Sequence, residues 1–418
     1  MDPSVLKRVV RDVGTPVYIY DEGLLRRNLQ IFSSAFASNY PKTKVLYAYK
    51  ANSSLAILSI FCKGGAGADV VSAGELETAA KIGLSGGDMM FSSNAKTAAE
   101  ISLAIELGAV INVDSAGELS VVQKAAKALK RRARISFRIN PGVDPRTHAK
   151  IATGLKDSKF GLHIEGGNAF SAYRTASGMK EVEIVGVHTH IGSQIKETGP
   201  FVDAAEKIME FVSRLKNELS IELRFVDLGG GLGVPYQEEK FATPEELAGA
   251  IIPVVRKWNE KIGYEPELWL EPGRYLVADA GVLACSVQSV KQTPYHTFVN
   301  VDAGFNTLIR PAMYGAYHRI TVLGPGNARP MKKYDVAGNV CESGDIFARD
   351  LELPEVTAGD VLLIHDAGAY GFAMASRYNS RPLPAEVLVR RDGSFDIIRQ
   401  RETAEDLYRG QKVPKDLQ

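Results

Sequence analysis

Lys50 occupies a position at which a lysine amine could act as a nucleophile. It follows the apolar run Val-Leu-Tyr-Ala-Tyr at residues 45–49, which is typical of a buried strand. An amine at the mouth of such a strand loses part of its hydration, and this favours the neutral form that attacks a carbonyl. The alternative for Lys50 alone is an ordinary surface lysine at a strand end.

A glycine-rich segment follows another apolar run. Asp227 and a leucine precede Gly229, Gly230 and Gly231. Because these residues have no side chains, their backbone amides can approach a phosphate closely. The segment has neither the spacing of a dinucleotide-binding fingerprint nor the Gly-Lys-Ser ending of a P-loop. It therefore indicates a phosphate site of another kind or, alternatively, only a tight turn.

The segment Glu271-Pro-Gly-Arg274 places an acid and a base on one short turn after a further apolar run. A carboxylate at such a place can keep a pyridine nitrogen protonated, which turns the ring into an electron sink. The alternative is an ion pair between Glu271 and Arg274 that serves only the fold.

His188 and His190 lie two residues apart in an expected strand, so their side chains should share one face. Two such histidines could begin a metal site. The sequence has no HExxH motif and no cysteine cluster, and no third ligand is evident nearby. We therefore predict that no metal is used here.

Cys341 and Glu342 begin a Cys-Glu-Ser-Gly-Asp segment between two expected strands of the C-terminal region. A lone cysteine is most often a small buried hydrophobe. The acidic neighbour and the glycine favour a reactive position instead, but the composition of the segment leaves both interpretations open.

Eight short apolar runs alternate with helical patterns in the first two thirds of the chain. The runs are 45–49, 68–71, 89–92, 110–113, 134–139, 184–190, 223–228 and 268–270. Eight strand-then-helix units predict a closed (β/α)8 barrel of the TIM type, with an open doubly wound sheet as the alternative. The chemistry of such barrels lies where strands end, and these runs end in or near Lys50, Asp69, His190, Asp227 and Glu271. Reactive residues are therefore expected along one rim.

Alternating β patterns replace the helical ones after Arg274. They cover 282–290, 297–301, 319–323, 361–365, 386–389 and 395–398, and they predict a C-terminal all-β domain. An early run at 17–20 precedes the first barrel strand and could pair with this domain. We therefore assign residues 28–275 to the barrel, and residues 1–27 and 276–418 to the β domain.

The sequence Ser-Ala-Gly-Glu-Leu occurs twice, beginning at Ser72 and at Ser115. Each copy follows an expected strand and opens a helix, with Glu75 or Glu118 three residues after the serine. This spacing predicts two capping boxes, in which the serine and the glutamate satisfy free backbone N–H groups. Glu75 therefore has a sufficient structural explanation.

The composition favours a small-molecule partner over a nucleic acid or a membrane. The 50 basic and 49 acidic side chains give a formal net charge of +1. The spacings of the three cysteines match neither a disulfide framework nor a Cys-x-x-Cys metal site, which favours a reducing compartment. The first 14 residues are charged and broken by Pro3, and no apolar run is long enough to span a membrane. We therefore expect a cytoplasmic protein.

Taken in order, eight segments resemble the signature set of the diaminopimelate decarboxylase family, and together they span nearly the whole chain. They are Tyr-Ala-Tyr-Lys-Ala-Asn around Lys50, Gly-Ala-Asp-Val-Val-Ser around Asp69, His-Thr-His-Ile-Gly-Ser-Gln at 188–194, Gly-Gly-Gly-Leu-Gly at 229–233, Glu-Pro-Gly-Arg at 271–274, Arg-Pro-Ala-Met-Tyr at 310–314, Cys-Glu-Ser-Gly-Asp at 341–345 and Gly-Ala-Tyr at 368–370. The resemblance implies a fold-type III enzyme that uses pyridoxal 5'-phosphate (PLP), with an alanine-racemase-like barrel and β domain. It also implies a head-to-tail homodimer with active sites at the interface.

The resemblance implies roles for residues of the barrel. Lys50 would be joined covalently to the cofactor, His190 would stack on its ring, and Glu271 would face its pyridine nitrogen. Asp69 and Arg138 would lie close to the lysine and the histidine. The phosphate would be held by a serine, by the glycine turn and by the backbone of the following turn: Ser193, Gly229, Gly230, Gly231, Pro272, Gly273 and Arg274.

The resemblance also implies a set of substrate contacts: Arg274, Arg310, Tyr314, Glu342 and Tyr370. The two arginines and Tyr314 would grip a carboxylate, Glu342 would receive a distal ammonium group, and Tyr370 would line both cofactor and substrate. Cys341 would return a proton to the reacting carbon. Glu342 and Cys341 would reach in from the other subunit.

The implied reaction is the decarboxylation of meso-2,6-diaminopimelate to L-lysine and CO2, the last step of lysine biosynthesis. The distal end of this substrate carries a carboxylate and an ammonium group, which Arg310 and Glu342 would pair. Ornithine, lysine or arginine decarboxylases of the same fold are the nearest alternative. Alanine-racemase-like enzymes tend to place a cation against the pyridine nitrogen, so Glu271 argues against that activity. A non-catalytic regulatory relative is the alternative from a different class.

Overall fold

The computed structural model describes all residues of the chain except 146, 148–150, 152, 156–157 and 325–328. The chain forms two compact units, each described by itself. The barrel unit comprises Arg26–Pro235 and Glu239–Leu276, and the β unit comprises Met1–Leu25, Tyr236–Glu238 and Val277–Gln418. Among the described residues, no helix combines the length and the apolar composition needed to cross a membrane.

The barrel unit is built on short strands whose residues are mostly apolar and therefore become buried. In the described part of the chain, eight of them form a closed parallel barrel. They are β2 (Thr43–Ala48), β3 (Gly67–Val70), β4 (Met89–Ser92), β5 (Val110–Val113), β6 (Ala133–Asn140), β8 (Val182–His188), β9 (Phe225–Asp227) and β10 (Glu267–Leu270), with β7 (Leu162–His163) attached to β6. The pairing of β5 with β6, which places Ile111 opposite Ile135, closes the ring. The predicted barrel is thus confirmed, and the open sheet is excluded.

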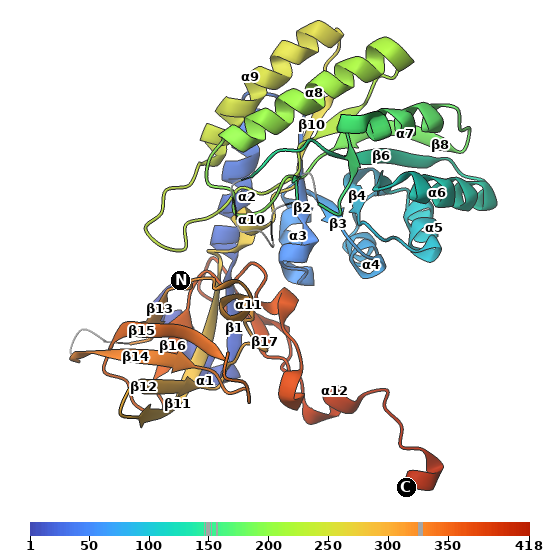
Figure 1. Ribbon diagram of the computed structural model, residues 1–418. Coiled ribbons are helices and arrows are strands. Elements are labelled where there is room, and N and C mark those ends of the chain that lie inside the picture. Colours follow the sequence, from blue (N-terminus) through green and yellow to red (C-terminus); the bar gives the residue numbers. More distant parts are fainter. Residues whose placement is uncertain (146, 148–150, 152, 156–157, 325–328) are drawn as a thin grey trace. The chain divides into compact units, whose positions relative to one another are not determined.

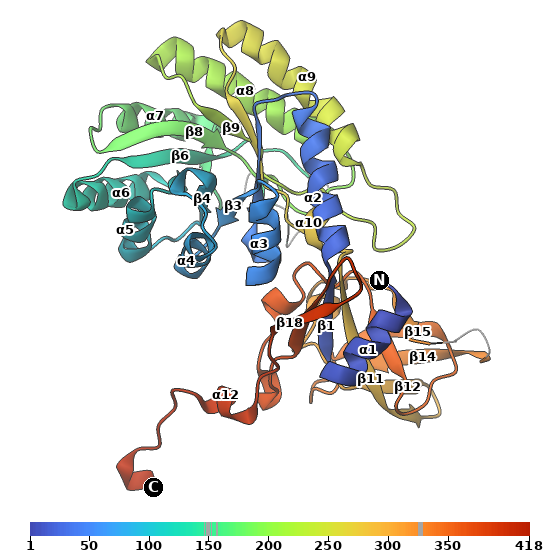
Figure 2. The same ribbon diagram turned by 180° about the vertical axis from the view of Figure 1, so that it is seen from behind.

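Helices follow the strands along the chain and lie outside them (Figure 1). They are α2 (Glu22–Ala37), α3 (Leu55–Lys63), α4 (Ala73–Lys81), α5 (Ala98–Leu107), α6 (Ala116–Leu129), α7 (Asn168–Ser177), α8 (Gly199–Leu219), α9 (Pro244–Ile262) and the short α10 (Arg274–Val277). The long helices α8 and α9 pack side by side in both views of the molecule (Figures 1 and 2). This alternation of strand and helix directs the ends of all eight strands to one rim.

Large side chains fill the interior of the barrel. One cluster unites residues from strands all around the ring: Leu46, Met90, Val110, Val185, Phe225 and Trp269. The rings of Phe225 and Trp269 stack with centroids 3.8 Å apart. Gly186 allows this packing, because a Cβ atom at that position would overlap the Phe225 ring. A packed interior gives the rim a rigid base.

The two Ser-Ala-Gly-Glu segments cap their helices in a modified way. The Ser72 and Ser115 hydroxyl groups accept hydrogen bonds from the N–H groups of Glu75 and Glu118, as predicted. The glutamate carboxylates do not complete capping boxes. They accept instead from the residue before the serine, Glu75 from Val71 N–H (2.8 Å) and Glu118 from the corresponding amide. The carboxylates therefore tie each strand end to its helix.

The β unit contains one mixed sheet with several small helices. Its elements are α1 (Pro3–Val13), β1 (Val17–Asp21), β11 (Gly281–Gln292), β12 (Thr297–Val301), α11 (Arg310–Tyr314), β13 (Ile320–Val322), β14 (Met331–Ala337), β15 (Ile346–Pro354), β16 (Val361–Ile364), β17 (Ala385–Val389), β18 (Phe395–Arg399) and α12 (Ala404–Tyr408). The strand order is β15-β14-β12-β11-β1-β17-β18, with β16 pairing with β11 and β13. Strand β1 pairs with β11 and β17, so the prediction that residues 17–20 join this domain is confirmed.

Three features of the β unit were not predicted. Strands β14 and β15 were not predicted. Strand β14 begins with exposed residues, and β15 is interrupted by Asp350, whose φ of 50° breaks the alternation of a strand. Pro3 does not break the N-terminal segment but begins helix α1, where its fixed φ fits the first turn. Helix α1 packs on β1 and β17 (Figure 2).

Candidate active site

Lys50 and Asp69 form an ion pair at the rim of the barrel. Lys50 lies in the short 3-10 turn η1 (Tyr49–Ala51) directly after β2, and its Nζ is 2.8 Å from Oδ2 of Asp69. The register of β2 and β3 sets this contact, because Ala48 lies opposite Asp69. Asp69 is fully buried, and its Oδ1 has no hydrogen-bond partner among the described residues. Lys50 is thus held by a buried carboxylate and is not an ordinary surface lysine.

His188, Asp227 and Glu271 form a buried cluster on the same rim. They stand at the ends of β8, β9 and β10, and one ligand atom of each lies within 4.8 Å of the others. His188 Nε2 is 3.1 Å from Glu271 Oε2, and Asp227 Oδ1 accepts a hydrogen bond of 2.8 Å from Gly229 N–H. The statement that no third group lies near the histidine pair is therefore wrong, since neighbouring strands bring in residues distant in sequence. The absence of a metal stays a prediction.

Burial and neighbouring charges shift the pKa values of Asp227 and Glu271 in opposite directions. Burial raises the pKa of Asp227 well above its usual value, and the nearby Glu271 carboxylate adds to the shift. Burial alone would also raise the pKa of Glu271, but the His188 ring and the Lys50 ammonium group lower it to about 2. The pKa values of the two carboxyl groups are thus moved in opposite directions, and Glu271 is ionised at neutral pH.

His190 presents a neutral ring to the site. Its Nδ1 accepts a hydrogen bond of 3.2 Å from Gly230 N–H, so a ring proton must be on Nε2. Burial and the positive charges of Lys50 and Arg138 lower the pKa of His190 well below its usual value. Arg138, on β6, lies over the Phe160 ring at 4.4 Å. A neutral ring held along one edge is suited to stacking on another flat ring.

The glycine turn lies against backbone on several sides. A Cβ atom on Gly230 would overlap the carbonyl oxygen of Glu271, and one on Gly231 would overlap that of Gly192. Gly229 and Gly231 also adopt φ values of 70° and 118°, which strain any residue with a side chain. Glycine is required here, and the turn exposes bare backbone as a phosphate site needs.

Ser193 and the turn at 271–274 adjoin the glycines. The Arg274 guanidinium group donates to Ser193 Oγ at 3.1 Å. The carbonyl of Pro272 accepts from Ala48 N–H at 3.2 Å, which ties the turn to the end of β2 just before the lysine. A residue larger than glycine would be crowded at position 273, because its Cβ atom would be only 3.1 Å from Ala48 Cβ. The lysine, the acid and the glycine turn are thus braced against one another.

These groups fit PLP, the cofactor that the resemblance implies. Lys50 offers the amine for its aldehyde, and the turn from Gly229 to Gly231 offers an open backbone for its phosphate. Glu271 Oε1 is buried without a hydrogen-bond partner among the described residues. An ionised oxygen in that state is costly unless a donor binds to it, and a protonated pyridine nitrogen is such a donor.

Arg310 is buried in the β unit, where His318 and Tyr236 contact it. Its Nη1 is 2.8 Å from His318 Nε2, and its guanidinium carbon lies 4.7 Å from the centre of the Tyr236 ring. A guanidinium group can only donate, so His318 accepts through Nε2 and its Nδ1–H donates to the carbonyl of His365. The sequence does not predict a role for His318, because a histidine eight residues after an arginine belongs to no pattern of known mechanism.

Tyr314 and Tyr370 also belong to the β unit. Tyr314 ends α11, the short helix that Arg310 begins. Tyr370 has a φ of 55°, a conformation that bulky residues rarely adopt and that often marks functional sites. The structure thus groups the predicted cofactor residues of the barrel on one rim and places the other predicted residues in the second unit.

Cys341 and Glu342 are exposed in the turn between β14 and β15. The Asp345 carboxylate shapes this turn by accepting hydrogen bonds from Phe305 N–H (2.6 Å) and Val340 N–H (2.7 Å). The interpretation of Cys341 as a buried hydrophobe is therefore wrong. A cysteine and an acid are presented outward on a turn of fixed shape.

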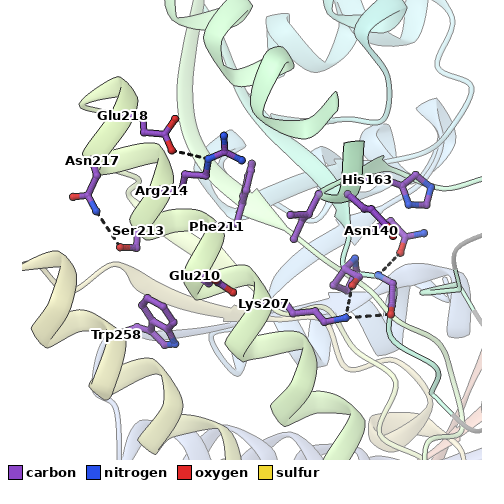
Figure 3. Close-up of a pocket in the computed structure, with 14 residues that line it drawn as sticks. Asn140, His163, Lys207, Glu210, Phe211, Ser213, Arg214, Asn217, Glu218 and Trp258 are labelled. Carbon is purple, nitrogen blue, oxygen red and sulfur yellow. Dashed lines mark hydrogen bonds and ion pairs between the residues drawn. The ribbon is translucent and has the colours of Figure 1, made fainter. Parts of the chain in front are cut away.

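A cavity of about 670 Å³ lies elsewhere on the barrel unit, between α8, α9 and the ends of β6 and β7 (Figure 3). It shares no residue with the rim site. The Lys207 amine donates to the carbonyls of Pro141 and Gly142, and Arg214 pairs with Glu218 at 2.7 Å. Lys207 and Arg214 are thus engaged with other residues of the cavity lining.

Comparison with known proteins gives a consistent result. The family described as pyridoxal-dependent decarboxylase, pyridoxal binding domain, matches residues 25–278. The diaminopimelate decarboxylases of Archaeoglobus fulgidus and Methanocaldococcus jannaschii are each 46% identical to this chain over 97% of its length, and over 95% and 92% of theirs.

Solved structures agree with this result. The M. jannaschii diaminopimelate decarboxylase in complex with L-lysine superimposes with a TM-score of 0.94 at 44% identity, covering 99% of this chain and 95% of that one. A lysine/ornithine decarboxylase from Vibrio vulnificus, at 20% identity and a TM-score of 0.80 over 94% of this chain and 98% of that one, shares the fold alone. The chain therefore belongs to the diaminopimelate decarboxylase family, within the pyridoxal-dependent decarboxylases.

Proposed function

We propose that this protein converts meso-2,6-diaminopimelate to L-lysine and CO2 with PLP as its cofactor. The observation that carries the proposal is the ionised, buried Glu271, with one unpaired oxygen, on the same rim as Lys50 and the glycine turn. A carboxylate against the pyridine nitrogen suits chemistry that passes through a carbanion. Relatives 40–46% identical over most of their length carry the name of this activity.

The cofactor supplies an aldehyde that combines with the substrate amine and a ring that accepts the electron pair left when CO2 departs. Glu271 would accept a hydrogen bond from the ring nitrogen and would keep that nitrogen protonated. The His188 ring, 3.1 Å away, favours the ionised form of Glu271. Burial raises the pKa of Asp227, which disfavours a second negative charge beside Glu271.

Other rim residues hold and shield the reacting groups. Lys50 would present its amine to the aldehyde of the cofactor, and Asp69, 2.8 Å away, would hold that amine in position. His190, neutral and fixed by Gly230 N–H, would cover one face of the ring and exclude water from it. The backbone of the glycine turn would bind the phosphate.

We further propose a homodimer in which each site is completed by the exposed turn of the other subunit. That turn would bring Glu342 to the distal ammonium group of the substrate and Cys341 to the reacting carbon as the proton donor. Arg274, Arg310 and Tyr314 would bind carboxylate, and Tyr370 would line the site. The rigid setting of Arg310 against His318 supports this role, because a fixed guanidinium group discriminates well between substrates with and without a carboxylate.

The substrate assignment can be tested with the purified, PLP-loaded protein. We expect CO2 release from meso-diaminopimelate with lysine as the second product, and at least about 100-fold lower kcat/KM with ornithine, lysine or arginine, which lack the distal carboxylate. CO2 release and amino-acid chromatography measure both. Equal activity with ornithine would refute the substrate, and loaded protein inert toward all four amino acids would favour a non-catalytic relative.

Sharing of the sites can be tested by pairing two inactive variants. Lys50→Ala and Cys341→Ala are each expected to be inactive as homodimers. A heterodimer of the two, isolated by tandem affinity tags, has one site with both residues intact if each site uses both chains. It should therefore show about half of wild-type activity.

The control is a heterodimer of Lys50→Ala with wild-type protein, which should also show about half of wild-type activity. This control establishes that a dimer with one defective site works. If the mixed-variant heterodimer stays as inactive as its parents while the control is active, Lys50 and Cys341 act within one chain, and the shared site is refuted.

A further inference from the structure

Gln194 adopts a backbone conformation that needs an explanation. Its φ of 58° lies in the left-handed region, which is unfavourable for a residue with a side chain and comfortable for glycine. The residue directly follows Ser193 and lies near the glycine turn. A side chain kept where glycine would fit better must contribute something that offsets the backbone cost.

The side-chain amide of Gln194 makes two hydrogen bonds to one backbone position. Its Nε2 donates to the carbonyl of Val234 at 2.7 Å, and its Oε1 accepts from Val234 N–H at 3.2 Å. An amide that donates and accepts in this way imitates a neighbouring strand. Val234 is buried and stands just after the glycine turn, so these bonds fix the point where the turn leaves the site.

Backbone contacts join the same two segments. Ile195 N–H donates to the carbonyl of Gly231 at 3.0 Å, and Gly233 N–H donates to the carbonyl of Ile195 at 3.1 Å. Ile195 and Leu232 form an isolated parallel bridge. The Gln194 side chain adds two further hydrogen bonds beyond this bridge. At the other end of the turn, His190 Nδ1 accepts from Gly230 N–H.

We propose that Gln194 is a positioning residue that clamps the glycine turn in the shape that binds the phosphate of the cofactor. It touches neither cofactor nor substrate in this role and acts through the backbone from Gly229 to Val234. The inference rests on the proposed function, since it takes the glycine turn as the phosphate site. It goes further by giving a task to a residue outside the phosphate contacts.

The test compares binding of PLP with binding of pyridoxal, which has the same aldehyde and ring but no phosphate. Gln194→Gly relieves the backbone strain and removes the clamp. Gln194→Glu keeps the size of the side chain but sets a carboxylate oxygen against the Val234 carbonyl. For both variants we expect the Kd for PLP to rise about tenfold, as for the loss of one to two hydrogen bonds, and the Kd for pyridoxal to change less than about twofold.

Equilibrium dialysis of the full-length apoprotein measures both constants. The matched control is Lys130→Gly, because exposed Lys130 also has a left-handed φ, 52°, at the end of α6 and far in sequence from the turn. This variant should bind PLP and pyridoxal as the wild type does. Circular dichroism establishes that each variant is folded, and Gln194→Glu gives the answer if Gln194→Gly is not.

Three results would overturn the inference. Gln194 variants that bind PLP as tightly as the wild type would show that the clamp is dispensable. Variants that lose PLP and pyridoxal affinity by the same factor would show a general structural role. Wild-type protein that binds the two compounds equally well would refute the phosphate site itself, and the proposed function with it.

Discussion

Replacement of Lys50 by alanine is expected to abolish turnover together with the covalent attachment of the cofactor. Lys50 stands on the rim with Asp69 at 2.8 Å, and alanine leaves no amine there for the aldehyde. We expect kcat to fall by at least about 10⁴-fold. Borohydride reduction followed by intact-mass measurement reads out attachment, because the wild-type chain gains one reduced cofactor and the variant gains none.

Lys44→Ala is the matched control for this experiment. Lys44 lies on the same strand, β2, where it pairs with Asp88 at 2.7 Å and lies over the Trp269 ring. Its loss should leave attachment intact and most of the activity in place. A cofactor linkage that persisted in Lys50→Ala would move the attachment site to another lysine and remove the basis of the mechanism.

Glu271→Gln is expected to lower kcat by about 10³-fold while the cofactor remains bound. The amide has nearly the shape of the carboxylate but no charge, so it cannot hold the ring nitrogen protonated. Lys50 and the glycine turn are unchanged, and they should keep the cofactor in place. Because the pKa of Glu271 is lowered to about 2, the wild-type carboxylate is ionised at every working pH. The loss in the variant should therefore be uniform over about pH 6 to 9.

Steady-state kinetics and cofactor absorbance measure the two halves of this prediction. Glu267→Gln is the control, at the opposite end of the same strand. Glu267 contacts Arg224 at 3.3 Å and the Trp269 indole at 2.8 Å, away from the rim. This variant should keep nearly full kcat. A Glu271→Gln enzyme of nearly wild-type kcat would show that the acid does not control the ring nitrogen.

The barrel could be predicted from sequence because its strands are buried on both faces. All four residues of β4 and of β5 are buried, so each strand appears as an uninterrupted apolar run with sharp ends. The same property makes the rim predictable. In a parallel barrel every strand ends on one side, and the first polar residue after each run, such as Lys50 or Glu271, must lie there.

Features that depend on distant residues could not be predicted in this way. The pairing of His188 with Glu271 and the approach of Asp227 follow from the order of β8, β9 and β10 around the ring, which no local pattern encodes. Strands β14 and β15 could not be predicted for a different reason. They are partly exposed, so burial imposes little alternation on their sequence.

The position of β1 inside the second sheet has a consequence for synthesis on the ribosome. This strand emerges early, yet it lies between β11 and β17, and β17 is translated about 360 residues later. All eight barrel strands are complete by residue 270, long before that sheet can close. Strand β1 therefore has no neighbouring strand on either side while the barrel assembles. Deleting it would split the sheet through its middle instead of trimming an edge.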